Sequence, residues 1–115
     1  MLITSMDDDI YAEFDEVIGE IYEMVEAKSK KYFRKSVPYL QLGLLEELGA
    51  SGFADFIANF DEEFKVIDCN IGSGLFSFKG VYVVIRYRCK WEISTTISVN
   101  VFEAFSDAVS FYSKI

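Results

Sequence analysis

Residues 64–101 read FKVIDCNIGSGLFSFKGVYVVIRYRCKWEISTTISVNV, and this stretch decides the fold. From Phe64 onward, apolar residues recur at every second position, which is the period of β-strands, whereas the preceding residues follow a helical period. In the longest run, one phase comprises Val81, Val83, Ile85, Tyr87, Cys89 and Trp91. The other phase includes Tyr82, Arg86, Arg88 and Lys90. Alternation of this kind predicts strands that bury one face.

Glycines divide this stretch into three or four predicted strands. The glycine-rich segment 72–74 predicts a turn after a first strand over residues 65–71. The residues that share one face of this first strand are Ile67, Cys69 and Ile71. Gly80 shifts the alternation, which indicates a bulge or a tight turn, and a further strand covers 93–101 after a turn near 89–92. Because short turns join these strands, the sheet is expected to be antiparallel.

Three helices are predicted before the strands. The first covers residues 7–35, and its apolar stripe comprises Ile10, Phe14, Val17, Ile18, Ile21, Val25 and Tyr32. Acidic residues at its start and basic residues between 28 and 35 would complement the helix dipole. Proline at position 38 predicts a second helix over 37–48, and Ser51 begins a third that continues to about Phe60.

A closing helix is predicted over residues 102–112, where helical spacing returns. The chain of 115 residues is therefore expected to form a single α+β domain over residues 1–115. This domain has three N-terminal helices, then a three- or four-stranded antiparallel sheet, then a C-terminal helix. The helices are expected to form a layer on one face of the sheet.

Composition excludes several classes of function. The chain has 19 acidic and 11 basic residues, a net charge of −8 and no histidine. Nucleic acids and anionic membranes attract clustered cations, so neither is an expected partner. The lack of histidine removes the commonest general base and metal ligand, and the carboxylates show no catalytic spacing. We therefore expect no enzyme, no cofactor and no metal site.

The cellular location is expected to be the cytoplasm. The N-terminus lacks the basic start and apolar core of a signal peptide, and no run approaches 18 apolar residues. Cys69 and Cys89 are accordingly expected to be buried thiols rather than a disulfide.

Acidic residues are concentrated at one end of the chain. Residues 1–27 contain nine acidic residues and no basic one, whereas residues 28–115 contain ten acidic residues and all eleven basic ones. In a helix, five of the nine fall within an arc of roughly 80° away from the apolar stripe. These five are Asp9, Glu13, Glu16, Glu20 and Glu23. Their like-charge pairs destabilise the helix by roughly 1–2 kcal/mol in total.

This arc is either an ordinary solvated surface or a docking site for a basic partner. A docking site of this charge would raise the association rate more than the affinity. Tyr11 and Tyr22 lie at the edge of the apolar stripe, where they are either anchors for the partner or core residues.

In its size, helix-rich N-terminal half, acidic first helix and lack of catalytic residues, the chain resembles the small acidic immunity proteins that neutralise bacterial toxins. This class includes the immunity partners of contact-dependent growth inhibition and of colicin-type nucleases. The resemblance implies a cytoplasmic antitoxin that occludes the basic active site of a cognate protein toxin of the nuclease type. It also implies that the five arc residues contact the toxin.

Two other functions remain open at this point. The first is a small-molecule-binding α+β domain with an aromatic pocket on the sheet formed by Tyr87, Trp91, Phe76 and Phe78. The second is a secretion-type chaperone that binds an unfolded segment. A net charge of −8 disfavours a nucleic-acid platform on the basic row Arg86, Arg88 and Lys90. These side chains are expected either to pair with acidic residues across the sheet or to extend over its outer face with their charged ends in water.

Overall fold

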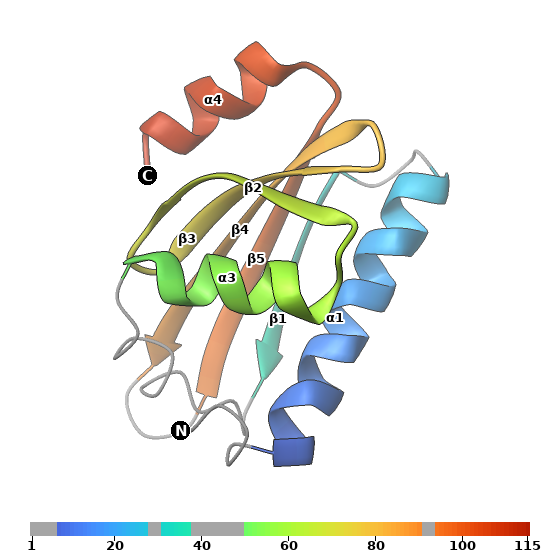
Figure 1. Cartoon of the computed structure of the whole chain (residues 1–115), viewed down its shortest axis with the longest axis vertical. Coiled ribbons are helices and arrows are strands. Elements are labelled where there is room, and N and C mark those ends of the chain that lie inside the picture. The colour runs from blue at the N-terminus through green and yellow to red at the C-terminus, as the bar shows by residue number, and fades with distance from the viewer. Residues whose placement is uncertain (1–6, 28–30, 38–49, 91–93) are drawn as a thin grey trace.

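The protein is an α+β domain built on one five-stranded sheet (Figure 1). The computed structural model describes residues 7–27, 31–37, 50–90 and 94–115. Its elements are α1 (Asp7–Ala27), β1 (Tyr32–Val37), α3 (Ala50–Phe60), β2 (Phe64–Asn70), β3 (Ser73–Phe78), β4 (Val81–Lys90), β5 (Ser94–Phe102) and α4 (Phe105–Ser113). The strand order is β1-β5-β4-β3-β2, and every neighbouring pair is antiparallel. The predicted class and strand direction are confirmed, but the predicted count of three or four strands is wrong.

Strands β2 to β5 form a meander of consecutive hairpins, because tight turns occur where the glycines predict them. The β3–β4 turn is Lys79–Gly80, and both residues have positive φ angles of 46° and 86°. A two-residue turn with two positive φ angles matches the right-handed twist of the strands on either side. The β2–β3 turn begins one residue earlier than predicted, at Ile71–Gly72, so that Ser73 already pairs with Asn70.

The fifth strand is β1, and it occupies the place of the last turns of the predicted first helix. The helix ends at Ala27, and Tyr32–Val37 pairs with β5. Phe33, which is 5% exposed, lies in the core, whereas its neighbours Tyr32 and Arg34 are exposed. The prediction of a helix to residue 35 is therefore wrong. Lys31, Arg34 and Lys35 do not complement the dipole of α1, whose last turn contains no basic residue.

Two of the other three predicted helices are confirmed by the structure. The helix expected from Ser51 to Phe60 is confirmed as α3, and the closing helix is confirmed as α4. The second predicted helix lies outside the described residues, apart from its first residue at position 37, which ends β1. In the described part of the chain, no helix is long and apolar enough to cross a membrane.

The described N-terminal helices form the expected layer on one face of the sheet, and the closing helix covers the other face. Helices α1 and α3 pack on one face, which we call the major face, and α4 packs on the other, the minor face (Figure 1). The sheet residues buried on the major face include Phe76, Phe78, Val83, Ile85, Ile97, Val99 and Val101. The buried residues of the minor face are Leu75, Val84, Ala108 and Tyr112.

Strand β2 departs from the predicted alternation. A register shift between Val66 and Asp68 interrupts its pairing with β3. Ile67 and Ile71 are 41% and 74% exposed, so the expected inner face of Ile67, Cys69 and Ile71 does not form. Cys69 is a half-buried free thiol, and the side chain of Cys89 lies outside the described residues.

Candidate functional site

The outward side of α1 is the first candidate surface. The helix buries Phe14, Val17, Ile18, Ile21 and Met24 against the sheet and α3. The residues exposed on the opposite side are Ala12, Asp15, Glu16, Gly19, Glu23 and Glu26. Their spacings of three and four residues place them on one face of the helix. We call the four carboxylates among them, Asp15, Glu16, Glu23 and Glu26, the acidic face.

The acidic face overlaps only partly with the predicted arc. Glu16 and Glu23 are exposed as expected, whereas Glu20 is half-buried. Asp9, Tyr11 and Glu13 belong to α1, but their side chains lie outside the described residues.

Two residues of the acidic face, Asp15 and Glu26, were missing from the predicted arc. Met24, which the predicted apolar stripe omitted, is 3% exposed, whereas Val25 is only half-buried. The buried side of α1 is therefore rotated, and this rotation turns Asp15 and Glu26 toward solvent. Including Met24 in the apolar stripe would have revealed them.

One cation contacts the acidic face within the described part of the chain. Lys35 Nζ lies 3.0 Å from Glu16 Oε2, across the gap between β1 and α1. The other ion pair among the described residues joins Lys31 to Glu103 at 3.4 Å. Asp15, Glu23 and Glu26 therefore have no ion-pair partner among these residues, and their charges are available to another molecule.

The acidic face also contains two features that weaken α1. Gly19 lies in its centre, and a Cβ atom added there would meet no atom within 4 Å. A glycine inside a helix costs about 1 kcal/mol relative to alanine. The like-charge pairs Glu16–Glu20 and Glu23–Glu26 each cost about 0.2–0.5 kcal/mol. Packing within the described residues gives no reason for the glycine.

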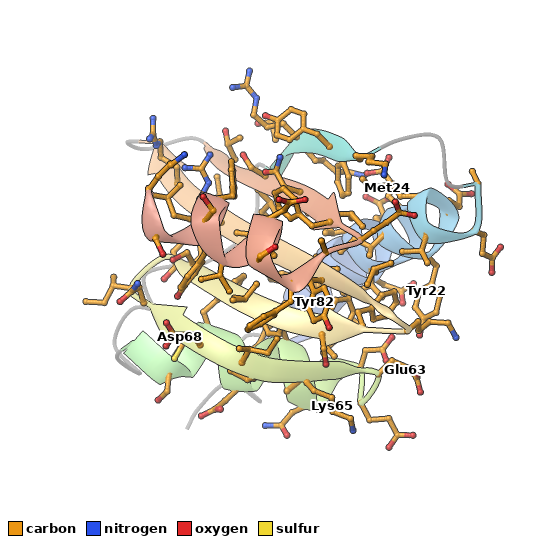
Figure 2. The ribbon with its side chains drawn as sticks, turned by 90° about the horizontal axis from the view of Figure 1, so that it is seen from above. Tyr22, Met24, Glu63, Lys65, Asp68 and Tyr82 are labelled. Carbon is orange, nitrogen blue, oxygen red and sulfur yellow. The ribbon has the colours of Figure 1, made fainter. Side chains whose placement is uncertain are left out.

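Tyr22 has a structural role beside this surface. Its hydroxyl donates a hydrogen bond to Asp61 Oδ2 at 3.0 Å, and its ring meets Phe78 edge-on at 5.0 Å. Burial, the hydrogen bond to Asp61 and the negative charges of Asp61 and Glu63 raise the pKa of Tyr22 to about 12. Tyr22 and Glu63 lie at the same end of the molecule (Figure 2). Tyr22 thus joins α1 to the turn between α3 and β2.

A second candidate surface lies on the minor face of the sheet. It is a groove of about 790 Å³, which we call the arginine groove. Its lining residues are Tyr32, Arg34, Asn70, Ile71, Gly72, Ser73, Arg86, Tyr87, Arg88, Thr96, Ser98 and Ile115. Strands β1, β5 and β4 supply its floor, and the β2–β3 turn and the residue that follows α4 supply its sides.

The arginine groove replaces the aromatic pocket that the sequence suggested. Phe76 and Phe78 are fully buried in the core of the major face, and the ring of Tyr87 packs against Phe53 at 4.6 Å. Trp91 lies outside the described residues. The proposed aromatic pocket is therefore wrong for the three residues that the structure describes.

Sequence reasoning identified Arg86 and Arg88 but misjudged their neighbours. Arg86 lies opposite Ser98 and Ser73, and Arg88 lies opposite Thr96. Their cross-strand neighbours are therefore residues with hydroxyl groups and not the acidic residues that were expected. Arg34 lies opposite Ser98 from the other side and was missed, because it was assigned to a helix. The side chain of Lys90 lies outside the described residues.

The described residues of the two surfaces were compared with the arrangements that hold metal ions and with known proteins. No cluster of three or more cysteine, aspartate or glutamate residues in the described part of the chain is arranged to hold a metal ion. In comparisons with known proteins, the chain matches no family model, no curated protein and no solved structure.

Proposed function

We propose that this chain is an immunity protein, an antitoxin that binds a basic toxin domain of the nuclease type and occludes its active site with the acidic face of α1. One observation carries the proposal. Three of the four carboxylates of the acidic face are exposed and have no ion-pair partner among the described residues. A basic partner would therefore not have to displace any cation of the described residues from these three carboxylates.

The acidic face lowers the stability of α1, and this supports a role for it beyond folding. Gly19 and the repeated glutamates weaken α1, whereas a helix surface that serves only solubility gains stability from mixed charges. Ala12 and Gly19 are exposed between the carboxylates. Small residues there would let the backbone of a partner approach α1 closely while its lysines and arginines reach the carboxylates.

The proposal includes a cytoplasmic location and a bacterial toxin as partner. A nuclease has to be neutralised where its nucleic acid substrate lies, and its active site has to attract phosphates with positive charge. An acidic protein surface offers that site a competing anion. Electrostatic attraction would speed the encounter, and contacts at the centre of the interface would supply most of the affinity.

The direct test uses the toxin domain encoded by the reading frame immediately upstream of this chain. We expect that domain to be basic and toxic when expressed alone, and we expect this chain to neutralise it and co-purify with it. The double variant Glu23→Lys/Glu26→Lys should weaken the complex at least tenfold, about 1.4 kcal/mol, at low salt. The effect should shrink at high salt, because salt screens exposed charges.

Asp107→Lys is the matched control for the single variant Glu23→Lys, since each changes the charge by +2, and Asp107 is exposed on α4, on the other side of the sheet. Its complex should retain an affinity within about twofold of the wild type after the general change in net charge is allowed for. Equal losses in the two variants would show that net charge alone matters and would remove α1 from the interface.

Gly19 gives a second, independent test. Gly19→Ala should raise the free energy of unfolding by about 1 kcal/mol. Gly19→Gln should leave the fold intact, because the space around the glycine is open within the described residues, yet it should weaken toxin binding by placing a long side chain in the acidic face. Unchanged toxin affinity for Gly19→Gln would contradict close contact at this position.

A further inference from the structure

All three arginines of the chain lie in the arginine groove. The sequence contains Arg34, Arg86 and Arg88 and no other arginine, and each of the three lines the groove. None of the lysines whose side chains the structure describes is among the lining residues. Arginine differs from lysine in its planar fork of donors, which matches two oxygens of a phosphate or carboxylate group. The segregation of arginine from lysine therefore points to oxyanion recognition rather than to general positive charge.

The sheet register places one arginine on each side of a serine. Arg34 on β1 and Arg86 on β4 are both paired with Ser98 on the strand between them. Neighbouring strands lie about 4.8 Å apart, so the two backbone positions are separated by roughly 10 Å. Arg88 follows Arg86 on the same face at a distance of roughly 7 Å. Side chains of this length can converge on a single anion from such positions.

The guanidinium of Arg86 lies over an aromatic ring, and one of its nitrogen atoms has no hydrogen-bond partner among the described residues. Its Cζ atom lies 5.8 Å from the centre of the Phe111 ring on α4. Its Nε atom is buried and makes no hydrogen bond to any described residue. Buried donors are nearly always paired in folded proteins, so an unpaired donor at the wall of a groove indicates a missing acceptor.

No acidic side chain of the described residues lines the groove. The lining residues include no aspartate or glutamate, and no arginine takes part in an ion pair among the described residues. Asp68 lies one cross-strand row away, at the position that pairs with Leu75. In a chain with a net charge of −8, a groove that in the described part of the chain is lined by three arginine side chains and no acidic side chain is a local reversal of sign.

We propose that the arginine groove binds a small molecule through a phosphomonoester group. Three guanidinium groups match a dianion better than a single carboxylate, and the hydroxyls of Ser73, Thr96 and Ser98 are additional donors. The volume of about 790 Å³ lies within the range of small-molecule sites. This function is separate from toxin binding, because the groove and the acidic face lie on opposite sides of the sheet.

The rim of the groove indicates an organic part on the ligand. Tyr32, Ile71 and Ile115 line it and are 47%, 74% and 44% exposed. A tyrosine ring and two aliphatic side chains provide an apolar edge against which a flat or apolar group can pack. A single-stranded nucleic acid is disfavoured as the occupant, because its further phosphates would meet a strongly acidic protein beyond the groove.

Inorganic phosphate and AMP are suitable probes, followed by amide chemical shifts of the isotope-labelled chain and by calorimetry. Phosphate should shift the signals of residues 70–73, 86–88 and 96–98 at millimolar concentration, and AMP should bind more tightly than phosphate. Adenosine, which lacks the phosphate, should bind at least tenfold more weakly than AMP. Succinate, a dicarboxylate, should also bind at least tenfold more weakly than AMP.

Three variants test the roles of the arginines. Arg34→Lys keeps the charge but removes the fork, and we expect it to weaken AMP binding at least fivefold. Arg88→Gln should weaken AMP binding at least tenfold. Lys65→Gln is the matched control, because it removes one exposed positive charge at the other end of β2 from the groove (Figure 2). Its affinity for AMP should stay within twofold of the wild-type value.

Several results would overturn the proposal. These are the absence of shifts in the groove with phosphate at 50 mM, equal affinity for AMP and adenosine, tighter binding of succinate than of AMP, or full affinity in Arg34→Lys. A hexameric single-stranded RNA that binds more than tenfold tighter than AMP would assign the groove to nucleic acid instead. Groove shifts that arise on concentrating the protein without phosphate would assign it to the acidic face of a second copy.

Discussion

The two faces of the sheet differ in the kind of side chain that covers them. The major face is apolar along the central strands and is covered by two helices that carry aromatic side chains into it, among them Phe14, Phe53 and Phe56. The minor face has a small core of two buried sheet residues and two residues of the short helix α4, and beside it arginine and hydroxyl side chains line a groove. The major face is filled by apolar side chains, whereas the minor face has buried polar atoms without hydrogen-bond partners among the described residues.

This difference separates the residues that hold the fold from those that are free to bind. Buried apolar area is the main source of stability, and most of it lies on the major face. Unpaired buried polar atoms work against stability, and those among the described residues are Arg86 Nε, Asn100 Oδ1 and the Tyr112 hydroxyl. All three residues belong to the minor face or to α4 above it. Substitutions on the two faces should therefore have unequal effects.

The largest difference is expected between two neighbouring core residues of β3. Phe76 points to the major face and Leu75 to the minor face, and both are at most 2% exposed. Phe76→Ala should lower the free energy of unfolding by about 4 kcal/mol, because it leaves a large cavity between the sheet and two helices. Leu75→Ala should lower it by about 2 kcal/mol, since the smaller cluster beneath α4 can collapse onto the space.

Urea denaturation followed by circular dichroism measures both losses. Similar slopes of the transition in the two variants would show that the comparison concerns stability and not the compactness of the unfolded chain. A loss for Leu75→Ala as large as that for Phe76→Ala would contradict the unequal roles of the two faces.

A smaller difference is expected between two tyrosine hydroxyls, one in each layer of helices. Tyr22→Phe removes a hydrogen bond to a carboxylate and should destabilise the protein by about 1.5 kcal/mol. Burial of the Tyr112 hydroxyl raises its pKa, whereas the nearby side chains of Ser73 and Asn70 act to lower it. The hydroxyl makes no hydrogen bond among the described residues. Tyr112→Phe should therefore change stability by less than about 0.5 kcal/mol or raise it. Thermal unfolding of the two variants side by side gives the sign of each effect.

The raised pKa of Tyr22 leads us to expect a loss of stability at high pH. The pKa of Tyr22 is about 12 in the folded chain, against an ordinary value of 10.0. Below pH 10 the hydroxyl is protonated in both states, and its contribution to stability is complete. Between pH 10 and 12 the unfolded chain loses this proton first, so stability falls across that interval.

Tyr22→Phe should make this alkaline loss shallower without abolishing it, because burial also raises the pKa of Tyr112. The measurement is the urea midpoint of the wild type and the variant at pH 9, 10, 11 and 12. Parallel curves for the two proteins would mean that Tyr22 titrates normally.

The sequence predicted the major face much better than the minor one, for a physical reason. Strict alternation in β4 and β5 assigns Val83, Ile85, Ile97 and Val99 to one buried face, because only one side of these strands is apolar throughout. Strand β1 has no such signal of its own. Its pairing with β5 decides its structure, and helical spacing through Tyr32 was misleading.

The two candidate surfaces were predictable to different extents for the same reason. The acidity of α1 is a local property of one helix, and Glu16 and Glu23 could be identified from spacing alone. The arginine groove joins Arg34 to Arg86 and Arg88, which lie about fifty residues further along the chain. Only the strand order β1-β5-β4 brings them together. One sequence signal was available, namely that the chain contains three arginines and that two of them share a strand phase.

The smallest stability effect is expected for the arginines themselves. Arg88→Gln removes an exposed side chain that has no ion-pair partner among the described residues and lies near two like charges. The free energy of unfolding should therefore change by no more than about 0.5 kcal/mol, and relief of repulsion makes a small gain the expected sign. Urea denaturation at low and high salt checks this, since salt should reduce any gain. A loss above 1 kcal/mol would mean that Arg88 supports the sheet. The minor face would then contribute to the fold through its polar residues as well, and the division of roles between the two faces would not hold.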